Sequence, residues 1–231
     1  MSIFAIGDLH LSFGGNKPMC IFGDNWIGHA EKIEQDWKEK VKEEDLVLLV
    51  GDFSWATYLN DTKLDFEYLS KLPGKKLLLK GNHDYWWSTV TSMRKYLRQN
   101  HFENIDFIYN NSYEFEEYII TGTRGWNLTT DTIEDIKILK REQDRLRLSL
   151  KNGIDTYGEN KKIITCMHYP PLKINEISKF VDIMKEYSVQ KCIYGHLHAA
   201  SHKQAVEGQI EGIDFQLVSC DYTNFQLVKI G

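Results

Sequence analysis

Long apolar runs are missing from this 231-residue sequence: none approaches the roughly 18 residues that a membrane-spanning helix needs. The first residues, Met1-Ser-Ile-Phe-Ala-Ile, lack the basic segment of a signal peptide and lead directly into polar Gly7-Asp8. We therefore expect no membrane partner and no secretory leader. Internal repeats, low-complexity segments and obvious linkers are also missing, so a single domain over residues 1–231 is expected.

Cysteine is scarce, and its spacing suggests no pairing. The four cysteines are Cys20, Cys166, Cys192 and Cys220. Two of them, Cys166 and Cys192, fall inside apolar runs, so buried free thiols are the favoured interpretation. Free thiols fit a reducing compartment, and a cytoplasmic location is expected.

Positive charge is in short supply as well. The chain has 28 Lys and Arg against 33 Asp and Glu, a net charge of 28 − 33 = −5, with no block of like charge. This balance argues against long nucleic acid as a partner. It leaves room for a small anionic substrate, a nucleotide included, because a bound metal ion supplies positive charge locally.

What the sequence does contain is an alternation of short apolar strands and amphipathic helices. In the first part, strands are expected at residues 2–6, 45–50 and 76–80, and helices at about 28–41, 61–72 and 87–98. A polar residue follows each strand, and the order β-α-β-α-β favours a parallel sheet.

The second part begins with strand-like segments and then returns to the same rhythm. Strands are expected at 107–109, 113–115, 118–121, 162–167, 192–194, 209–220 and 225–230, the last two antiparallel. Asn110-Asn111 is interpreted as a hairpin turn. A long helix from about residue 132 to 150 is expected to end at Asn152-Gly153, and a shorter one spans about 177–184.

Polar residues typical of metal sites follow five of these strands. They are Asp8 and His10, Asp52, Asn82 and His83, His168, and His196 and His198. Turn chemistry explains any one of them, but not all five strand ends, because turns do not need imidazoles. Asp, His and Asn are ligands of Mn²⁺, Fe²⁺ and Zn²⁺. Without His83, these residues offer seven candidate ligands, which are too many for one ion and suit two.

Taken in order, these motifs resemble the signature of a known family. Asp8-Leu9-His10, Gly51-Asp52, Gly81-Asn82-His83-Asp84, His168 and Gly195-His196-Leu197-His198 match the motifs of the calcineurin-like metallophosphoesterases. Each motif is short, but the ordered set is specific and spans most of the chain. The resemblance implies an α/β fold in which a two-sheet β-sandwich is flanked by helices, as α/β/β/α layers, with a dinuclear metal site at the carboxyl ends of the strands.

The resemblance also implies a role for each motif. One divalent ion would be held by Asp8, His10, Asp52 and His198, and the other by Asp52, Asn82, His168 and His196. The chain would be a hydrolase of phosphomonoesters or phosphodiesters, in which a metal-bridging hydroxide attacks phosphorus and His83 protonates the leaving alkoxide. Asp84 would orient His83, and a neighbouring carboxylate would favour its imidazolium form.

Two other functions share these motifs. A nuclease or nucleotide phosphodiesterase has the same chemistry and differs only in its substrate. A non-catalytic scaffold of this fold should have lost part of the set, above all His83. Every member is present, so an enzyme acting on a small phosphate ester is favoured. The sequence does not specify its substrate, its metal or its oligomeric state.

Three further stretches have two interpretations each. Residues 11–27 form a long Gly-rich, aromatic stretch that is either a wall or lid over the site or a packed surface loop. Arg124 either binds a second phosphate or a carboxylate of the substrate or is a surface arginine in a turn, which is favoured. Tyr85-Trp86-Trp87 either stacks on a base or sugar or packs under the next helix, which is favoured. Residues 11–27 and 123–131 are expected to select the substrate.

Overall fold

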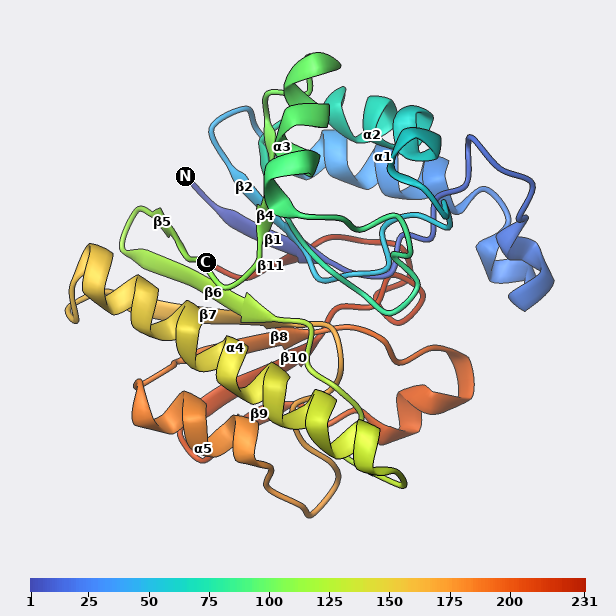
Figure 1. The fold of residues 1–231 in the computed structure, drawn as a ribbon. Helices are drawn as coiled ribbons and strands as arrows, with labels where there is room; N and C mark the ends of the chain where they lie inside the picture. The colour runs from blue at the N-terminus through green and yellow to red at the C-terminus, as the bar shows by residue number, and fades with distance from the viewer.

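Two β-sheets lie between two layers of helices in the computed structural model, which describes residues 1–231 (Figure 1). The first sheet has the strand order β11 (Val228–Lys229), β1 (Ile3–Ile6), β2 (Leu46–Leu49), β3 (Lys75–Leu79) and β4 (Ile105–Ile108). Strands β1 to β4 are parallel, and β11 pairs antiparallel with β1. The expected parallel β-α-β-α-β unit is therefore present.

The second sheet contains the remaining six strands. Its order is β5 (Tyr113–Phe115), β6 (Tyr118–Thr123), β7 (Lys162–Met167), β8 (Lys191–Tyr194), β10 (Ile213–Leu217) and β9 (Gly208–Ile210). The four central strands are parallel, whereas β5 and β9 are antiparallel edge strands. All strand ends that carry the candidate ligands therefore come from the parallel parts of the two sheets.

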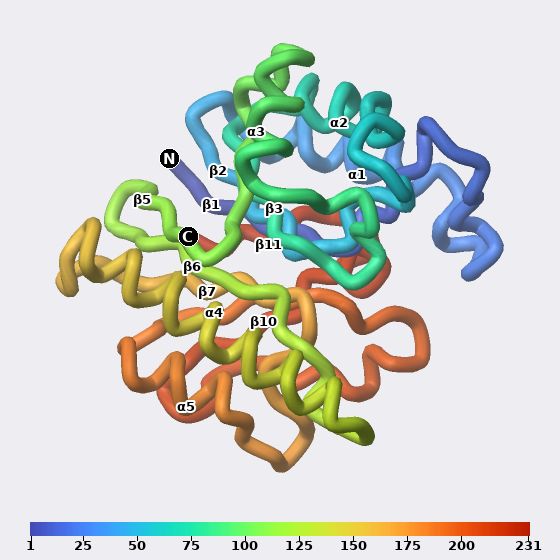
Figure 2. The backbone as a smooth tube through the Cα atoms, in the orientation of Figure 1, coloured from blue at the N-terminus to red at the C-terminus, as the bar shows by residue number.

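Helices cover the outer face of each sheet. The first sheet is covered by α1 (His29–Lys40), α2 (Lys63–Ser70) and α3 (Val90–Gln99), and the second by α4 (Ile133–Tyr157) and α5 (Lys179–Glu186) (Figure 1). Figure 2 shows that the chain builds the first half, crosses to the second, and returns at its end to pair β11 with β1. None of these helices is both long and apolar enough to cross a membrane.

Three apolar cores separate the four layers. Along β1, Ile3 and Ala5 face the core between the two sheets, whereas Phe4 and Ile6 face the core under α1 to α3. This alternation follows from the two-residue period of a strand that is buried on both faces. A third core lies between the second sheet and α4 and α5. The expected sandwich of α/β/β/α layers is confirmed.

Several expected boundaries are wrong. Asn110-Asn111 is not a hairpin turn, because β4 belongs to the first sheet and β5 to the second. Helix α4 continues through Gly153 to Tyr157, since Asn152 accepts hydrogen bonds from the backbone and hydroxyl of Ser112 and so packs the helix onto the sheet.

The C-terminal strands are shorter than expected. The segment expected as one strand at 209–220 is the hairpin β9–β10, which turns at Glu211-Gly212 with φ of 52° and 82°. All four cysteines are free, and Cys166, Cys192 and Cys220 are buried, in agreement with the interpretation of Cys166 and Cys192 as buried thiols.

Candidate metal centre

The carboxyl ends of five parallel strands bring all seven candidate ligands to one edge of the sandwich. In chain order, the first sheet contributes Asp8 and His10 after β1, Asp52 after β2 and Asn82 after β3, and the second contributes His168 after β7 and His196 and His198 after β8. The two halves are joined here, because the backbone N–H of His196 donates to both carboxylate oxygens of Asp8 at 3.1 Å.

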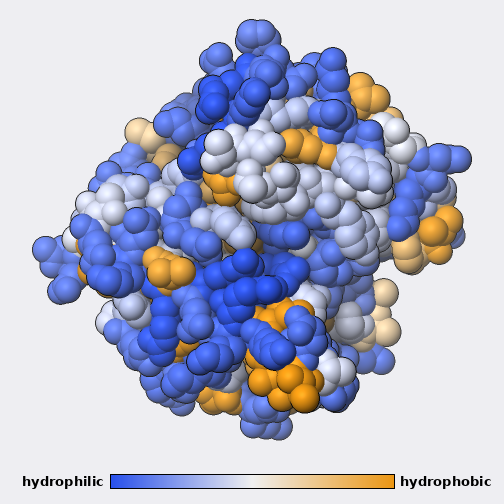
Figure 3. All heavy atoms as spheres, viewed as in Figure 1, coloured by the Kyte–Doolittle hydropathy of each residue, from blue (hydrophilic) through white to orange (hydrophobic).

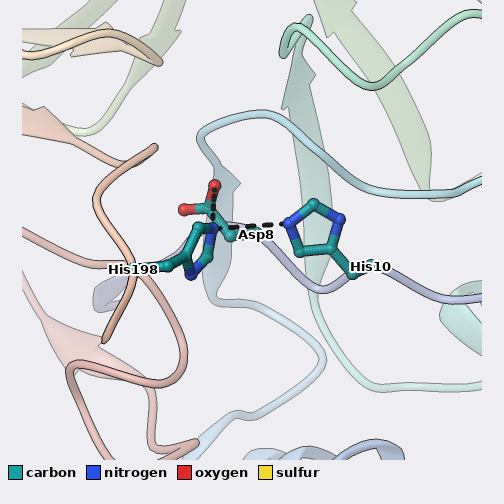
Figure 4. A group of neighbouring side chains, drawn as sticks. All are labelled: Asp8, His10 and His198. Atoms are coloured by element: carbon teal, nitrogen blue, oxygen red, sulfur yellow. Dashed lines mark hydrogen bonds and ion pairs between the residues drawn. The ribbon is translucent and has the colours of Figure 1, made fainter. Parts of the chain in front are cut away.

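One group of donors consists of Asp8, His10 and His198, whose ring nitrogens and carboxylate turn toward one another (Figure 4). The Nε2 atom of His198 lies 3.2 Å from Asp8 Oδ1 and 3.4 Å from His10 Nε2. Asp52 Oδ2 lies 3.8 Å from His10 Nε2 and so connects this group to the next one.

The second group surrounds His168. Its Nε2 atom lies 2.6 Å from Asn82 Oδ1, 3.2 Å from His196 Nδ1 and 3.5 Å from Asp52 Oδ2. Asn82 Oδ1 is also 2.8 Å from His196 Nδ1. Asp52 thus lies near both groups, and Asp8 Oδ1 is also 3.9 Å from His168 Nδ1.

This donor set fits a cation. The Nδ1 of His168 is 3.0 Å from the carbonyl oxygen of Val50, an acceptor only, so the ring carries its proton on Nδ1. Burial lowers the pKa of His168, which keeps the ring neutral. The Nε2 lone pair therefore faces the oxygen lone pairs of Asn82 and Asp52, with His196 Nδ1 beside them. Such convergent lone pairs are what a divalent ion requires.

Ionisation of the first group points the same way. Burial opposes the charged form of Asp8, but His198, His168 and His10 hold its pKa well below the usual range. Burial also opposes protonation of His198, but Asp8 and Asp221 raise its pKa to about 10. The protonated ring of His198 thus places positive charge where a metal ion would bind, and a metal ion that binds there would displace this proton.

Asp52 shows the charge crowding of the site. Burial, and then the neighbouring charge of Asp8, raise the pKa of Asp52 to about 8. A divalent ion next to the carboxylate would reverse this effect, because the ion's own charge dominates the local field.

Asp221 is a functional candidate that sequence reasoning missed. Its Oδ1 lies 2.8 Å from His198 Nδ1, which leaves Nε2 of that ring directed at Asp8. A carboxylate behind a ligating histidine fixes its tautomer and raises its basicity. The only sequence signal is that Asp221 follows β10 at the same edge of the sheet. His202, which matched no motif, lies 3.3 Å from the other oxygen of Asp221.

The backbone at the site is held in an uncommon conformation. Asp8, His10, Asp52 and His196 have φ values of 61°, 48°, 50° and 73°. Left-handed conformations of non-glycine residues persist only where the surroundings enforce them, and they cluster at functional sites. Gly81 is required for a different reason: a Cβ atom there would collide with the carboxylate and backbone nitrogen of Asp52.

Asp84 does not orient His83, contrary to the expectation. Both of its carboxylate oxygens are occupied elsewhere, and Nδ1 of His83 is buried without a hydrogen-bond partner. Asp84 accepts hydrogen bonds from the backbone N–H groups of Asp52, Phe53, Ser54 and Gly81 at 2.9, 2.9, 3.3 and 2.7 Å, and from Trp86 Nε1 at 3.0 Å. Neighbours in a tight turn point in different directions, and the carboxylate turns inward.

Asp84 therefore acts as a clamp between two strand ends. The N–H groups that it accepts belong to the turns after β2 and β3, which carry Asp52 and Asn82. The backbone N–H of His83 donates to Asp52 Oδ1 at 2.7 Å and ties the same two turns together. Burial, and then Asp52, raise the pKa of Asp84 to about 6.

His83 lies in the wall of a cavity beside the first donor group. The cavity, about 210 Å³, is lined by His10, Met19, Phe22, Trp26, Trp55, His83, His198, Ala199 and Asp221. The half-buried ring of His83 packs against Trp55, with ring centroids 4.5 Å apart. Burial, and then His168 and Lys17, lower its pKa and outweigh the support that the carboxylate of Asp8 gives to the imidazolium.

The alternatives for the three further stretches can now be compared with the structure. Residues 11–27 form a wall of the site, because Met19, Phe22 and Trp26 line the cavity beside His83. Trp86 is a core residue, as favoured, whereas Tyr85 is 62% exposed. Arg124 is not a surface arginine, since only 16% of its side chain is exposed and it lies 3.7 Å from Glu142.

Comparison with known proteins identifies the family of this chain. The family model described as calcineurin-like phosphoesterase matches residues 1–200. No curated protein matches the sequence.

Several solved structures share the fold. The phosphopantetheinyl hydrolase PptH from Mycobacterium tuberculosis has a TM-score of 0.56 at 13% identity, with 99% of this chain and 95% of that chain covered. The protein TT1561 of Thermus thermophilus gives 0.59 at 10% identity, covering 99% and 97%. A protein of unknown function from Aquifex aeolicus gives 0.52 at 17%, covering 99% and 95%. At these identities the likeness is one of fold.

Proposed function

Because the chain belongs to the calcineurin-like phosphoesterase family of metal-dependent phosphoester hydrolases, we propose that it hydrolyses a small phosphate ester at a dinuclear site formed by the seven strand-end ligands. The observation that carries the proposal is the convergence of imidazole nitrogens with amide and carboxylate oxygens on two adjacent centres. Asp8, His10, Asp52 and His198 would hold one divalent ion, and Asp52, Asn82, His168 and His196 the other.

The chain's own residues position the ligands in this reaction and form the wall of the cavity. When bound, two divalent ions such as Mn²⁺, Fe²⁺ or Zn²⁺ supply a water-derived nucleophile at neutral pH and neutralise charge on the phosphoryl oxygens. Asp84 and Asp221 hold the ligands in position through the contacts described above. Trp26 and Trp55 form an aromatic wall on the side of the cavity where His83 lies.

His83 is the proposed general acid. With Nδ1 buried, Nε2 is the nitrogen that can reach a leaving oxygen and donate its proton to it. Burial lowers the pKa of His83, so the protonated form is depleted as the pH rises toward neutrality. Turnover of esters with a poor leaving group should therefore decline with rising pH before turnover of activated esters does.

Metal analysis combined with paired ester assays tests the function. The purified protein is analysed for bound metal and assayed on an alkyl phosphate and on the matched dialkyl phosphate diester. Turnover of the monoester supports a phosphatase, whereas turnover of the diester alone would replace the phosphatase by a phosphodiesterase. Inactivity on both esters at full metal occupancy would support the non-catalytic scaffold.

Replacing His83 tests the mechanism separately from the fold. We expect His83→Ala to keep its metal and lose about 10²- to 10⁴-fold in kcat on an alkyl phosphate, which is the usual contribution of a general acid. A nitrophenyl ester should lose much less, because its leaving group needs little protonation. His101→Asn, at an exposed turn with φ of 60°, is the control for loss of a histidine elsewhere. Unchanged alkyl phosphate turnover in His83→Ala would refute the assignment.

A further inference from the structure

A second cavity, of about 260 Å³, lies where β3, β4 and β6 end against α4. Its lining includes four basic side chains, Lys80, Arg124, Arg141 and Arg145, and one acidic side chain, Glu142. We call it the basic cavity. Its formal charge is +4 − 1 = +3, in a chain whose net charge is −5. Strongly hydrophilic atoms gather over the middle of this face in Figure 3, between α3 and α4.

Glu142 cannot neutralise these four cations. Its Oε1 atom lies 2.6 Å from Arg145, 3.7 Å from Arg124 and 3.8 Å from Arg141, and Oε2 accepts a hydrogen bond from Thr123 at 2.8 Å. The carboxylate is 1% exposed and is therefore fully occupied by groups of the protein. Positive charge remains unpaired inside the cavity.

Two buried donors of the lining lack an acceptor. They are Nε of Arg124 and the indole Nε1 of Trp87, both without a hydrogen-bond partner. Buried donors are nearly always paired in folded proteins, so each needs an explanation. Ser88 and Asn110 add a hydroxyl and an amide to the same lining. With the exposed guanidinium of Arg141 added, the lining is rich in donors and poor in acceptors, a composition that suits an oxyanion with several acceptor oxygens.

The basic cavity adjoins the metal centre through two short stretches of backbone. Lys80 precedes the candidate ligand Asn82 by two residues, a separation of at most roughly 7 Å between their Cα atoms. The carbonyl oxygen of Arg124 accepts hydrogen bonds from the N–H groups of His168, at 3.2 Å, and Tyr169, at 2.9 Å. The basic cavity and the candidate metal centre are therefore neighbours at this edge of the two sheets.

We propose that the basic cavity binds a second anionic group of the substrate, a phosphate or a carboxylate, while the first phosphate ester is hydrolysed at the metal centre. The proposal rests on the proposed function and narrows its substrate class to esters with two anionic ends. Guanidinium groups suit this role, because their planar forks bind phosphate or carboxylate oxygens in pairs.

A series of esters of increasing length tests the proposal. Butyl phosphate has one anionic end, whereas alkanediol bisphosphates of two to six carbons and the corresponding phosphorylated hydroxy acids have two. Using protein loaded with the metal found in it, kcat/KM is measured for each ester. We expect at least one ester with two anionic ends to exceed butyl phosphate by about tenfold or more in kcat/KM, as one hydrogen bond to a charged group allows. Comparing the bisphosphate and acid series distinguishes phosphate from carboxylate.

Substitutions locate the preference in the cavity. Arg141→Gln and Arg124→Gln should each reduce the ratio of kcat/KM for the preferred ester with two anionic ends to kcat/KM for butyl phosphate. The ratio should fall toward one, mainly because KM of the preferred ester rises. Arg141 is the safer variant for folding, because 53% of its side chain is exposed. Arg147→Gln, on the same helix but paired with Glu186 outside the cavity, is the matched control and should keep the ratio.

The outcomes separate this proposal from the proposed function. Equal kcat/KM for all esters, or a preference that survives Arg141→Gln and Arg124→Gln, would overturn the second anionic site and leave the phosphoesterase intact. If no ester is hydrolysed, calorimetric titration of butanediol bisphosphate and butyl phosphate decides. Tighter binding of the bisphosphate that is lost in Arg141→Gln supports the cavity, and equal binding overturns it.

Discussion

Asp84→Asn tests whether this buried carboxylate is a clamp for the metal-binding turns or an orienter of His83. The substitution keeps the shape of the side chain but replaces one oxygen by an N–H₂ group. If the amide nitrogen takes the place of Oδ2, the N–H groups of Asp52 and Gly81 lose their acceptor. If it takes the place of Oδ1, Phe53, Ser54 and Trp86 lose theirs. At least two donors are unpaired in either orientation.

The expected change in the free energy of unfolding is small, so metal affinity is the decisive measurement. Two unpaired buried donors cost about 2–6 kcal/mol together. The pKa of Asp84 is raised from 3.8 to about 6, so holding it ionised at pH 7 costs roughly 3 kcal/mol, which the neutral amide avoids. The two effects nearly cancel, and the free energy of unfolding should fall by only about 1 kcal/mol. The unpaired N–H groups still loosen the turns that carry Asp52 and Asn82. The affinity for metal should therefore fall by about 10- to 100-fold.

The assay is a competition titration against a chromophoric chelator, followed by pH–rate profiles at saturating metal. We expect Asp84→Asn to need more metal and then to show the pH profile of the unsubstituted protein. Asp45→Asn is the matched control: Asp45 is also buried and accepts N–H bonds from Ser2 and Lys42, but it lies before β2. Unchanged metal affinity of Asp84→Asn together with a reduced kcat would refute the clamp and restore the role of orienter.

Two more substitutions probe the metal site and the sheet. Asp221→Asn should lower metal affinity about 10- to 100-fold in the chelator titration, because His198 loses the carboxylate that fixes its tautomer; equal affinity would contradict that role. Lys76 in β3 is 1% exposed, and burial lowers its pKa from 10.5 to about 8. Burying the charged amine therefore destabilises the fold below pH 8, and this cost vanishes as the pH rises to 10.5. Lys76→Met should therefore raise the free energy of unfolding in urea by about 1–3 kcal/mol at pH 7, and a gain of equal size at pH 10.5 would contradict this account.

The sequence predicts the candidate ligands well because their signal is local and their meeting point is geometric. Each ligand follows an apolar strand, and the carboxyl ends of parallel strands share one edge of a sheet. Contacts between distant segments carry no such signal. Asp221 meets His198 only because β10 lies beside β8. Arg124 belongs to the basic cavity only because α4 brings Glu142 and Arg145 against β6.

Errors at Asp84 and Asn110-Asn111 have the same physical origin. Adjacency in sequence suggested that Asp84 contacts His83, but a tight turn directs neighbouring side chains apart, and the inward carboxylate finds backbone N–H groups 30 to 32 residues away. Asn110-Asn111 has hairpin composition, yet the strands on either side of it pair in different sheets. Local propensity specifies a turn there, but not the partner of the strand that follows.

Strain and charge at the strand ends explain why the site needs the sandwich around it. Four candidate ligands have positive φ, which costs of order 1–3 kcal/mol each. Burial, and then the neighbouring charge of Asp8, raise the pKa of Asp52 to about 8. These local terms favour relaxation of the turns, and the three apolar cores and the Asp84 clamp oppose it. A divalent ion binds only the folded arrangement and reverses the repulsion, so added metal should stabilise the fold as RT ln(1 + [M]/Kd). The two sheets and the Asp84 clamp thus position the candidate ligands.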